Sequence, residues 1–241
     1  MKPGDADGRC ELQPAEVHVW RYTLDVQREN ADAWARLLSA EERERAQRFR
    51  QNQDRLLFTA RRGLLRQLIS RYTGMDPKLI TCTVNPYGKL SLPGSNLTFN
   101  LSHSADHVVF AFAAGMELGI DIEQVCPLPD IETVCRHWFS EAEQQALTDL
   151  PKSQRLDAFF HIWTQKEAFV KARGMGLSLP LQDFSVAADP NQPGGLLADA
   201  GAWQMVSLAA EPGWQAALCV QSLQPVKVKA KNQTLLPNLP V

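Results

Sequence analysis

The stretch "HIWTQKEAFVKARGMGLSLP", residues 161–180, places charged side chains within an apolar run that has the spacing of a helix. Trp163, Glu167 and Lys171 are four residues apart, so a helix would carry them on one stripe. One interpretation is an ordinary surface ion pair between Glu167 and Lys171, worth about 0.2–0.5 kcal/mol. The apolar neighbours favour another, in which the pair faces a cleft. The glycines that follow predict the end of this helix.

Upstream, "LGIDIE" (118–123) alternates as a strand does, with Asp121 and Glu123 on one face and isoleucines on the other. Solvation of both carboxylates on an exposed face remains open from these residues alone. In a central strand the pair would need a cation. With Glu167 as a third carboxylate, the set suits Mg²⁺, and Lys171 would neutralise substrate phosphates beside it.

Residues 36–71 contain ten arginines and only four acidic residues. This run predicts either a solvated helix face or a site for phosphates, which arginine recognises well. Ser39 and Glu42 form an S-x-x-E capping box, which predicts that a helix begins near Ser39. A second helix is expected from about Asp54 to Tyr72, ended by the glycine at 74.

Strand patterns occur at 17–24, 97–104, 107–115, 117–125, 203–211 and 214–222. A second S-x-x-E box, Ser140 to Glu143, precedes a long helix, and similar short matches recur in the same order in both halves. We therefore expect an α+β fold of two similar lobes related by a pseudo-twofold duplication. Each lobe would pack a small antiparallel sheet with helices, and the active site would lie at the lobe interface. The expected divisions are 1–113, 114–223 and a surface tail, 224–241.

The whole-chain totals exclude several classes. The 241 residues are 44% hydrophobic, the formal net charge is −2, and the five cysteines contain no C-x-x-C. A disulfide framework, a zinc knuckle, a nucleic-acid partner and a membrane span are not expected. His103 and His107 have a zinc-helix interval but lie in a strand-like segment without the H-E-x-x-H glutamate. We expect a soluble, cytoplasmic protein.

Three motifs in this order, "FNLSHS" (99–104), "LGIDIE" and "WTQKEAFVKARGMGLSLP" (163–180), closely resemble the Sfp-type branch of the 4′-phosphopantetheinyl transferase superfamily. The family signature is G-[IV]-D followed by W-[ST]-x-K-E-[AS]-x-x-K. Gly119–Asp121 and Trp163–Lys171 match it at every fixed position. The similarity extends from about residue 39 to residue 187.

The resemblance implies a holo-[acyl-carrier-protein] synthase, which moves the phosphopantetheine arm of coenzyme A onto a serine of an acyl or peptidyl carrier protein and releases adenosine 3′,5′-bisphosphate. By motif, Asp121, Glu123 and Glu167 would hold Mg²⁺ on the pyrophosphate, and Lys171 would bind the same group. The family fold is a monomer of two α+β lobes. Fatty-acid, polyketide and nonribosomal-peptide carriers are all open as substrates.

The resemblance also implies a binding set for coenzyme A, with the nucleotide contacts in the first lobe and the metal and catalytic residues in the second. Its members are Arg45, Lys89, Ser102, His103 and Lys171. Glu167 is the first candidate for the base that accepts the serine proton, and Glu143 is the second. A Mg²⁺-dependent phosphohydrolase acting on a nucleotide diphosphate, or a nuclease, could use the same three acids. An inactive carrier-binding protein is a further alternative, disfavoured by the complete acidic set.

Overall fold

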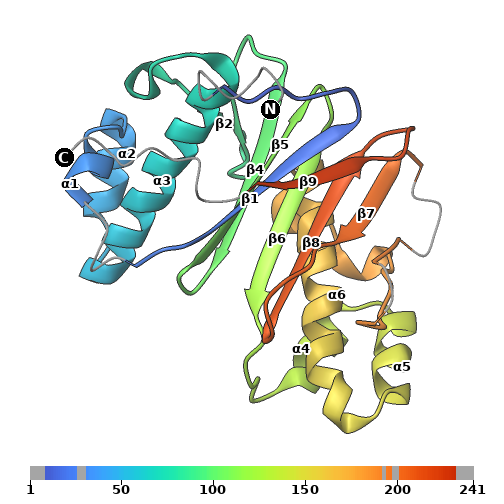
Figure 1. Ribbon diagram of the computed structural model, residues 1–241. Coiled ribbons are helices and arrows are strands. Elements are labelled where there is room, and N and C mark those ends of the chain that lie inside the picture. The colour runs from blue at the N-terminus through green and yellow to red at the C-terminus, as the bar shows by residue number, and fades with distance from the viewer. Residues whose placement is uncertain (1–8, 26–30, 192–193, 197–200, 232–241) are drawn as a thin grey trace.

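The computed structural model describes residues 9–25, 31–191, 194–196 and 201–231 (Figure 1). Helices and strands follow one another as β1 (Glu16–Thr23), α1 (Ala31–Ala35), α2 (Ala40–Gln47), α3 (Asn52–Thr73), β2 (Thr83–Val84), β3 (Leu90–Ser91), β4 (Leu97–Ser104), β5 (His107–Ala114), β6 (Leu118–Gln124), α4 (Ile131–Trp138), α5 (Glu141–Asp149), α6 (Lys152–Arg173), β7 (Trp203–Ser207), β8 (Trp214–Gln221) and β9 (Lys227–Lys231). The α+β class is confirmed.

The first lobe is a sheet with the strand order β4-β5-β1-β9, and α3 covers one face of it (Figure 1). Side chains on that face, among them Trp20, Phe110 and Phe112, form one core with Leu65 and Leu68 of α3. Helices α1 and α2 pack against α3 from outside. The period-two pattern of the strands thus supplies one apolar face to a helix with apolar residues every three to four positions.

The helix boundaries follow the capping signals of the sequence. The side chains of Ser39 and Ser140 each accept a hydrogen bond from the third helical N–H of α2 and α5, and both capping boxes are complete. Gly74 and Gly174 end α3 and α6 in the left-handed region, at φ 74° and 63°. The expected helix starts and stops are confirmed.

The second lobe is an antiparallel sheet with the order β6-β8-β7, on which α6 lies. Gly119 of β6 makes this packing close. A Cβ there would stand 2.2 Å from both the Ala168 carbonyl oxygen and the Ala172 nitrogen. A larger residue at 119 would therefore force α6 away from β6, and with it the Glu167 and Lys171 side chains.

The two sheets share a second core. Val109 and Ala111 of the first lobe pack with Ile120, Ile122 and Leu218 of the second, all of them buried. Strands β4 and β6, each at an edge of its own sheet, lie side by side where the lobes meet (Figure 1). The motifs in β4, β6 and α6 therefore come together in space.

The tail expected from residue 224 is corrected in part. Strand β9 pairs parallel with β1, from Glu16 opposite Lys227 to Trp20 opposite Lys231, so the first sheet is mixed rather than antiparallel. Val228 and Ala230 supply the apolar side chains of this strand. They alternate with lysines, so the sequence pattern did not indicate a strand here. Residues 232–241 of the expected tail lie outside the described part of the chain.

The internal duplication and the domain divisions stay predictions. In the described residues, no helix is long and apolar enough to span a bilayer.

Candidate active site

Three side chains from both lobes meet at the lobe junction. Lys171 Nζ of α6 donates to Asp121 Oδ1 at 2.6 Å and to Ser102 Oγ at 2.9 Å. The Ser102 hydroxyl in turn donates to the same Asp121 oxygen at 2.6 Å. The Asp121 side chain is 2% exposed and that of Lys171 27%, so the pair lies at the floor of an opening rather than in a sealed core.

The second oxygen of Asp121 is left bare. Oδ2 is buried and has no hydrogen-bond partner among the described residues. The charge of Asp121 acts on two further acids, Glu123 and Glu167. Burial, and then the charge of Asp121, raise the pKa of Glu123 to about 7. Burial also raises the pKa of Glu167; Lys171 opposes this shift and Asp121 adds to it. Three carboxylates thus share the single positive charge of Lys171 among the described contacts of this cluster.

This donor set fits a hard divalent cation, although the described residues hold no ready-made group of three His, Cys, Asp or Glu side chains around one point. The buried oxygen of Asp121 has no partner, and carboxylate oxygens are the ligands that Mg²⁺ prefers. Lys171 Nζ already contacts the other Asp121 oxygen. A bound cation would need modest side-chain movement at Glu123 and Glu167, which are only half-buried.

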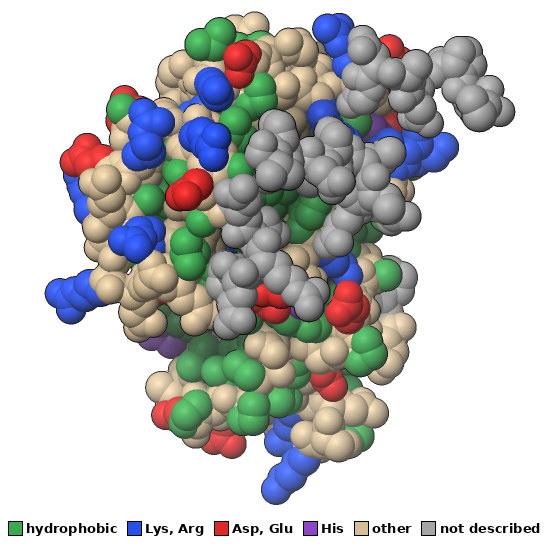
Figure 2. Space-filling view, turned by 60° about the vertical axis from the view of Figure 1, so that its left-hand side comes forward, with side chains coloured by type: hydrophobic (Ala, Val, Ile, Leu, Met, Phe, Trp, Pro, Cys, Tyr) green, Lys and Arg blue, Asp and Glu red, His purple; other side chains and the backbone are tan. Residues whose placement is uncertain are grey.

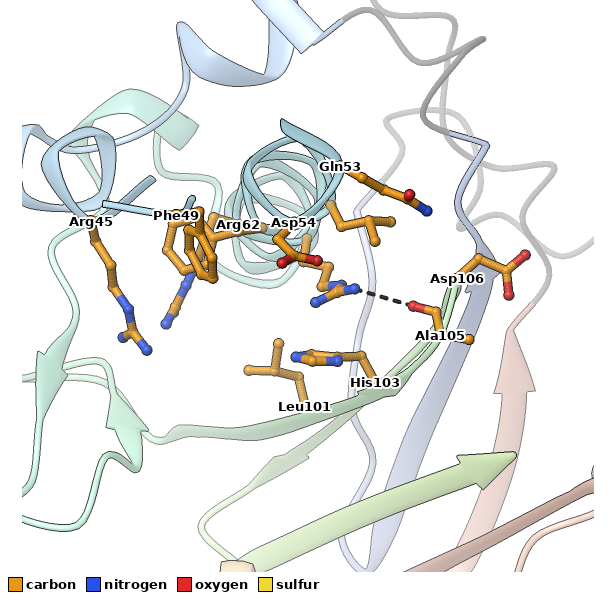
Figure 3. A pocket seen from close by; sticks show the side chains of 12 residues that line it. Arg45, Phe49, Gln53, Asp54, Arg62, Leu101, His103, Ala105 and Asp106 are labelled. Atoms are coloured by element: carbon orange, nitrogen blue, oxygen red, sulfur yellow. Dashed lines mark hydrogen bonds between the residues drawn. The ribbon is translucent and has the colours of Figure 1, made fainter. Parts of the chain in front are cut away.

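Glu167 and Lys171 line a cavity of about 340 Å³ between the 87–90 loop and the end of α6. A larger cavity of about 780 Å³ lies between α2, α3 and the end of β4 (Figure 3). Arg62, Leu101 and His103 line both cavities. The two spaces are thus adjacent, with Glu167 and Lys171 at the smaller one and three arginines at the larger one.

Three arginines line the larger cavity, against two acids, Asp54 and Asp106. Arg45 and Arg62 each place the guanidinium carbon 5.4 Å from the centre of the Phe58 ring. Arg61 donates to the carbonyl oxygen of Ala105 at 3.2 Å (Figure 3, dashed line), while its buried Nε has no partner in the described chain. Burial lowers the pKa of Arg61 to about 10, which leaves it charged at neutral pH. The cavity suits an anion.

His103 lies across the cavity from α3 (Figure 3). Burial, and then the charges of Arg61, Lys171 and Arg62, lower the pKa of His103 to about 4. Its ring is still exposed to solvent in the cleft, so the nearby cations are the more secure cause. At neutral pH the imidazole is uncharged and has one N–H to donate.

The arginine run serves both interpretations given above. Figure 2 brings the side of α1–α3 forward and shows Lys and Arg side chains scattered over that face, with acids between them. Arg48 is exposed and pairs with Glu44 at 2.6 Å. Arg66 is instead buried and clamps Glu42 and two carbonyl oxygens of the 77–80 segment. Arg45, Arg61 and Arg62 are the members that line the cavity.

Two residues of the expected coenzyme A set have other contacts here. Lys89 lines the smaller cavity, but its Nζ donates to Glu117 Oε2 at 2.5 Å and to the Ala172 carbonyl oxygen at 2.7 Å. Ser102 faces Asp121, whereas His103 faces the arginines, because neighbouring strand residues point to opposite faces. The Ser102 and His103 side chains therefore lie on opposite faces of β4, and this geometry does not favour binding of one phosphate by both.

Glu143 does not lie at the cleft. It is fully buried, with Oε2 2.8 Å from Lys166 Nζ and 2.8 Å from the Ser140 nitrogen. Its Oε1 accepts from the Val186 N–H at 2.8 Å. Both oxygens are thus occupied, and a substrate hydroxyl has no access to them. These contacts place Glu143 at the α5–α6 junction and favour a structural role over the expected catalytic one, which stays a prediction.

Arg61 and Arg62 had not been singled out from the sequence. Their spacing in the sequence could have indicated a shared role, because residues 58, 61 and 62 lie on one face of α3. Lys166 had no such signal, because its role depends on a carboxylate 23 positions earlier in the chain.

An acidic pocket that fits a divalent cation, joined to a cation-lined cavity, is the arrangement of an enzyme that transfers phosphoryl groups. Residues 117–219 match the family described as the 4′-phosphopantetheinyl transferase superfamily, and residues 25–115 match 4′-phosphopantetheinyl transferase, N-terminal.

Named relatives agree with this class. The chain is 35% identical over 209 residues to 4′-phosphopantetheinyl transferase HetI of Nostoc sp., covering 85% of this chain and 87% of that protein. It is 35% identical over 162 residues to 4′-phosphopantetheinyl transferase Sfp of Bacillus subtilis, covering 67% and 71%. Among solved structures, Thermotoga maritima holo-[acyl-carrier-protein] synthase matches 45% of this chain and 64% of that one, with 22% identity and a TM-score of 0.35.

The chain belongs to the 4′-phosphopantetheinyl transferase superfamily. The alternative of a phosphohydrolase finds no support in these comparisons.

Proposed function

We propose that this protein transfers the 4′-phosphopantetheine arm of coenzyme A to a serine of an acyl or peptidyl carrier protein, with Mg²⁺. The observation that carries the proposal is the bare, buried oxygen of Asp121 beside Lys171, next to a cavity walled by arginines. Family membership supports the same reaction. The carrier serine would attack the β-phosphorus, and adenosine 3′,5′-bisphosphate would leave with the bridging oxygen.

The nucleotide end of coenzyme A is assigned to the larger cavity. Arg45, Arg61 and Arg62 offer charged donors to its 3′-phosphate, and the neutral His103 ring adds one N–H. Lys171, which lines the smaller cavity, would meet the diphosphate. Lys89 would then act by holding the 85–89 loop against α6 rather than by binding phosphate directly.

Asp121, Glu123 and Glu167 are the residues that would hold Mg²⁺, which neutralises charge on the diphosphate when bound. The serine proton still needs an acceptor. Glu167 lines the smaller cavity. Its pKa is raised toward neutral pH, and a general base works best when its pKa lies near the working pH. We therefore assign the proton to a Glu167 carboxylate oxygen.

The test uses the purified protein, coenzyme A, Mg²⁺ and an apo carrier domain, with intact mass spectrometry of the carrier. The expected result is a carrier heavier by one phosphopantetheine. Consumption of coenzyme A while the carrier mass stays constant would contradict the transfer reaction and indicate hydrolysis.

We further propose that the protein acts as a cytoplasmic monomer with lobes at 1–113 and 114–223, and without a nucleic-acid or membrane partner. The free thiols of Cys82, Cys126, Cys135 and Cys219 support a reducing compartment. Light scattering coupled to size exclusion tests the monomer directly, and a mass twice that of the chain would contradict it.

A further inference from the structure

Strands β4 and β6 meet without a backbone ladder. In the described residues, β4 pairs only with β5 and β6 only with β8, although the two strands run side by side between the lobes. The edge N–H groups of β6 that face β4 therefore need acceptors of another kind, since several of them are shielded from water.

Side chains of β4 supply these acceptors. Asn100 Oδ1 accepts from the Ile120 N–H at 3.0 Å, and Ser104 Oγ accepts from the Gln124 N–H at 3.2 Å. Asn100, Ser102 and Ser104 are alternate residues, so all three point from the same face of β4. We call these three residues the polar seam.

The contacts of the polar seam enclose the carboxylates. Ile120 and Gln124, whose N–H groups donate to the seam, stand on either side of Asp121 and Glu123 in the chain. Ile120 is fully buried and Asn100 is nearly so, so water cannot replace the Asn100 oxygen. The seam thus ties the acidic pair of the second lobe to the lobe that carries the arginines.

We propose that Asn100 and Ser104 are positioning residues, which set where the Asp121 and Glu123 carboxylates stand for the divalent cation. This inference rests on the proposed function. Residues that orient metal ligands by hydrogen bonds typically change metal affinity by about 10–100-fold when they are removed. Asn100 and Ser104 both act through the backbone of β6, at the N–H groups of Ile120 and Gln124.

The experiment measures Mn²⁺ binding by calorimetry, with coenzyme A present and no carrier, so that no turnover occurs. For Asn100→Ala we expect the Mn²⁺ Kd to rise about 10-fold. The Kd for adenosine 3′,5′-bisphosphate without metal should stay constant, because the arginine cavity is untouched. Ser104→Ala should raise the Mn²⁺ Kd as well, and Ser104→Thr, which keeps the hydroxyl, should restore it.

Thr98→Val is the matched control. Thr98 lies on the same face of β4, but its hydroxyl donates to the carbonyl oxygens of Ala113 and Met116 rather than to β6. Its Mn²⁺ Kd should equal that of the unaltered protein. Thermal melting of every variant shows whether the fold is kept.

Two results would overturn the inference in distinguishable ways. If the unaltered protein binds no Mn²⁺ in the presence of coenzyme A, the proposed metal chemistry fails and the seam's role fails with it. If the unaltered protein binds Mn²⁺ and both Asn100→Ala and Ser104→Ala bind it equally well, only the seam is refuted.

Discussion

Helix α6 carries two lysines, each paired with a carboxylate of another element, and the two pairs differ in their surroundings. Lys166 and Glu143 are both 0% exposed, and the remaining Lys166 contacts are the carbonyl oxygens of Leu181 and Phe184. Lys171 and Asp121 instead lie at the cleft floor, where one oxygen of Asp121 has no described partner. The first pair is complete within the protein. The second leaves one buried oxygen without a partner among the described residues.

The difference teaches that charge in a buried helix does not by itself mark a site. Lys166 and Lys171 are five residues apart, about 140° around the helix, and so face different neighbours. The sealed pair joins α5, α6 and the 181–186 segment. The open pair has an unused acceptor, and unused buried acceptors need an explanation.

The largest expected effect would come from removing the open pair's acceptor. Asp121→Asn keeps the shape but removes the charge, so we expect carrier modification to fall about 10³-fold, as for loss of a main electrostatic group. The melting temperature should change little, because Lys171 can turn toward water. Mass-spectrometric rates over a Mg²⁺ series measure this. Turnover within threefold of the unaltered protein would contradict the comparison.

The sealed pair should respond in the opposite way. Glu143→Gln leaves Lys166 charged without a buried partner, and we expect the free energy of unfolding to fall by about 3 kcal/mol. The protein that stays folded should keep its turnover rate, since Glu143 is remote from the cleft. Urea unfolding and rates normalised to folded protein test both halves. A large rate loss at unchanged stability would restore Glu143 as a catalytic candidate.

Removing both charges of the buried pair, Glu143 and Lys166, tests whether the unpaired charge causes the loss of stability. Glu143→Gln with Lys166→Met should recover about 1–2 kcal/mol relative to Glu143→Gln alone, because no unpaired buried charge remains. Recovery should be incomplete, since the Lys166 bonds to two carbonyl oxygens are also lost. A double-mutant cycle in urea gives the coupling energy. Strict additivity of the two single changes would show that the pair contributes nothing.

A smaller effect is expected at His103 in the arginine cavity. Its pKa of about 4 in the free protein should rise when a phosphate binds beside it, so binding takes up protons between pH 4 and the raised value. Affinity for adenosine 3′,5′-bisphosphate without metal should therefore increase several-fold from pH 7.5 to 5.5.

Calorimetry at the two pH values measures this change. His103→Gln should remove most of the pH dependence while keeping one N–H donor. An equal pH dependence in His103→Gln would assign the proton uptake to another group.

Much of this architecture was predictable because its signals are local. The two capping boxes, the glycines that end α3 and α6, and the alternation in β4, β5 and β6 act within a few residues. The acids were found from their alternation and helical stripe. Long-range pairing could not be read in the same way. Lys166 with Glu143, Lys89 with Ala172, and Asn100 with Ile120 each depend on contacts formed only when distant segments pack together.

Strand β9 is a case in point, because its alternating lysines obscured a strand in the sequence. By covering the outer side of β1, it occupies backbone groups that would otherwise be open to another chain. An expression fragment ending near residue 223 would retain the cleft yet uncover Val17 and Val19, and such a fragment should aggregate. Shortened versions for crystallisation should keep the chain through residue 231.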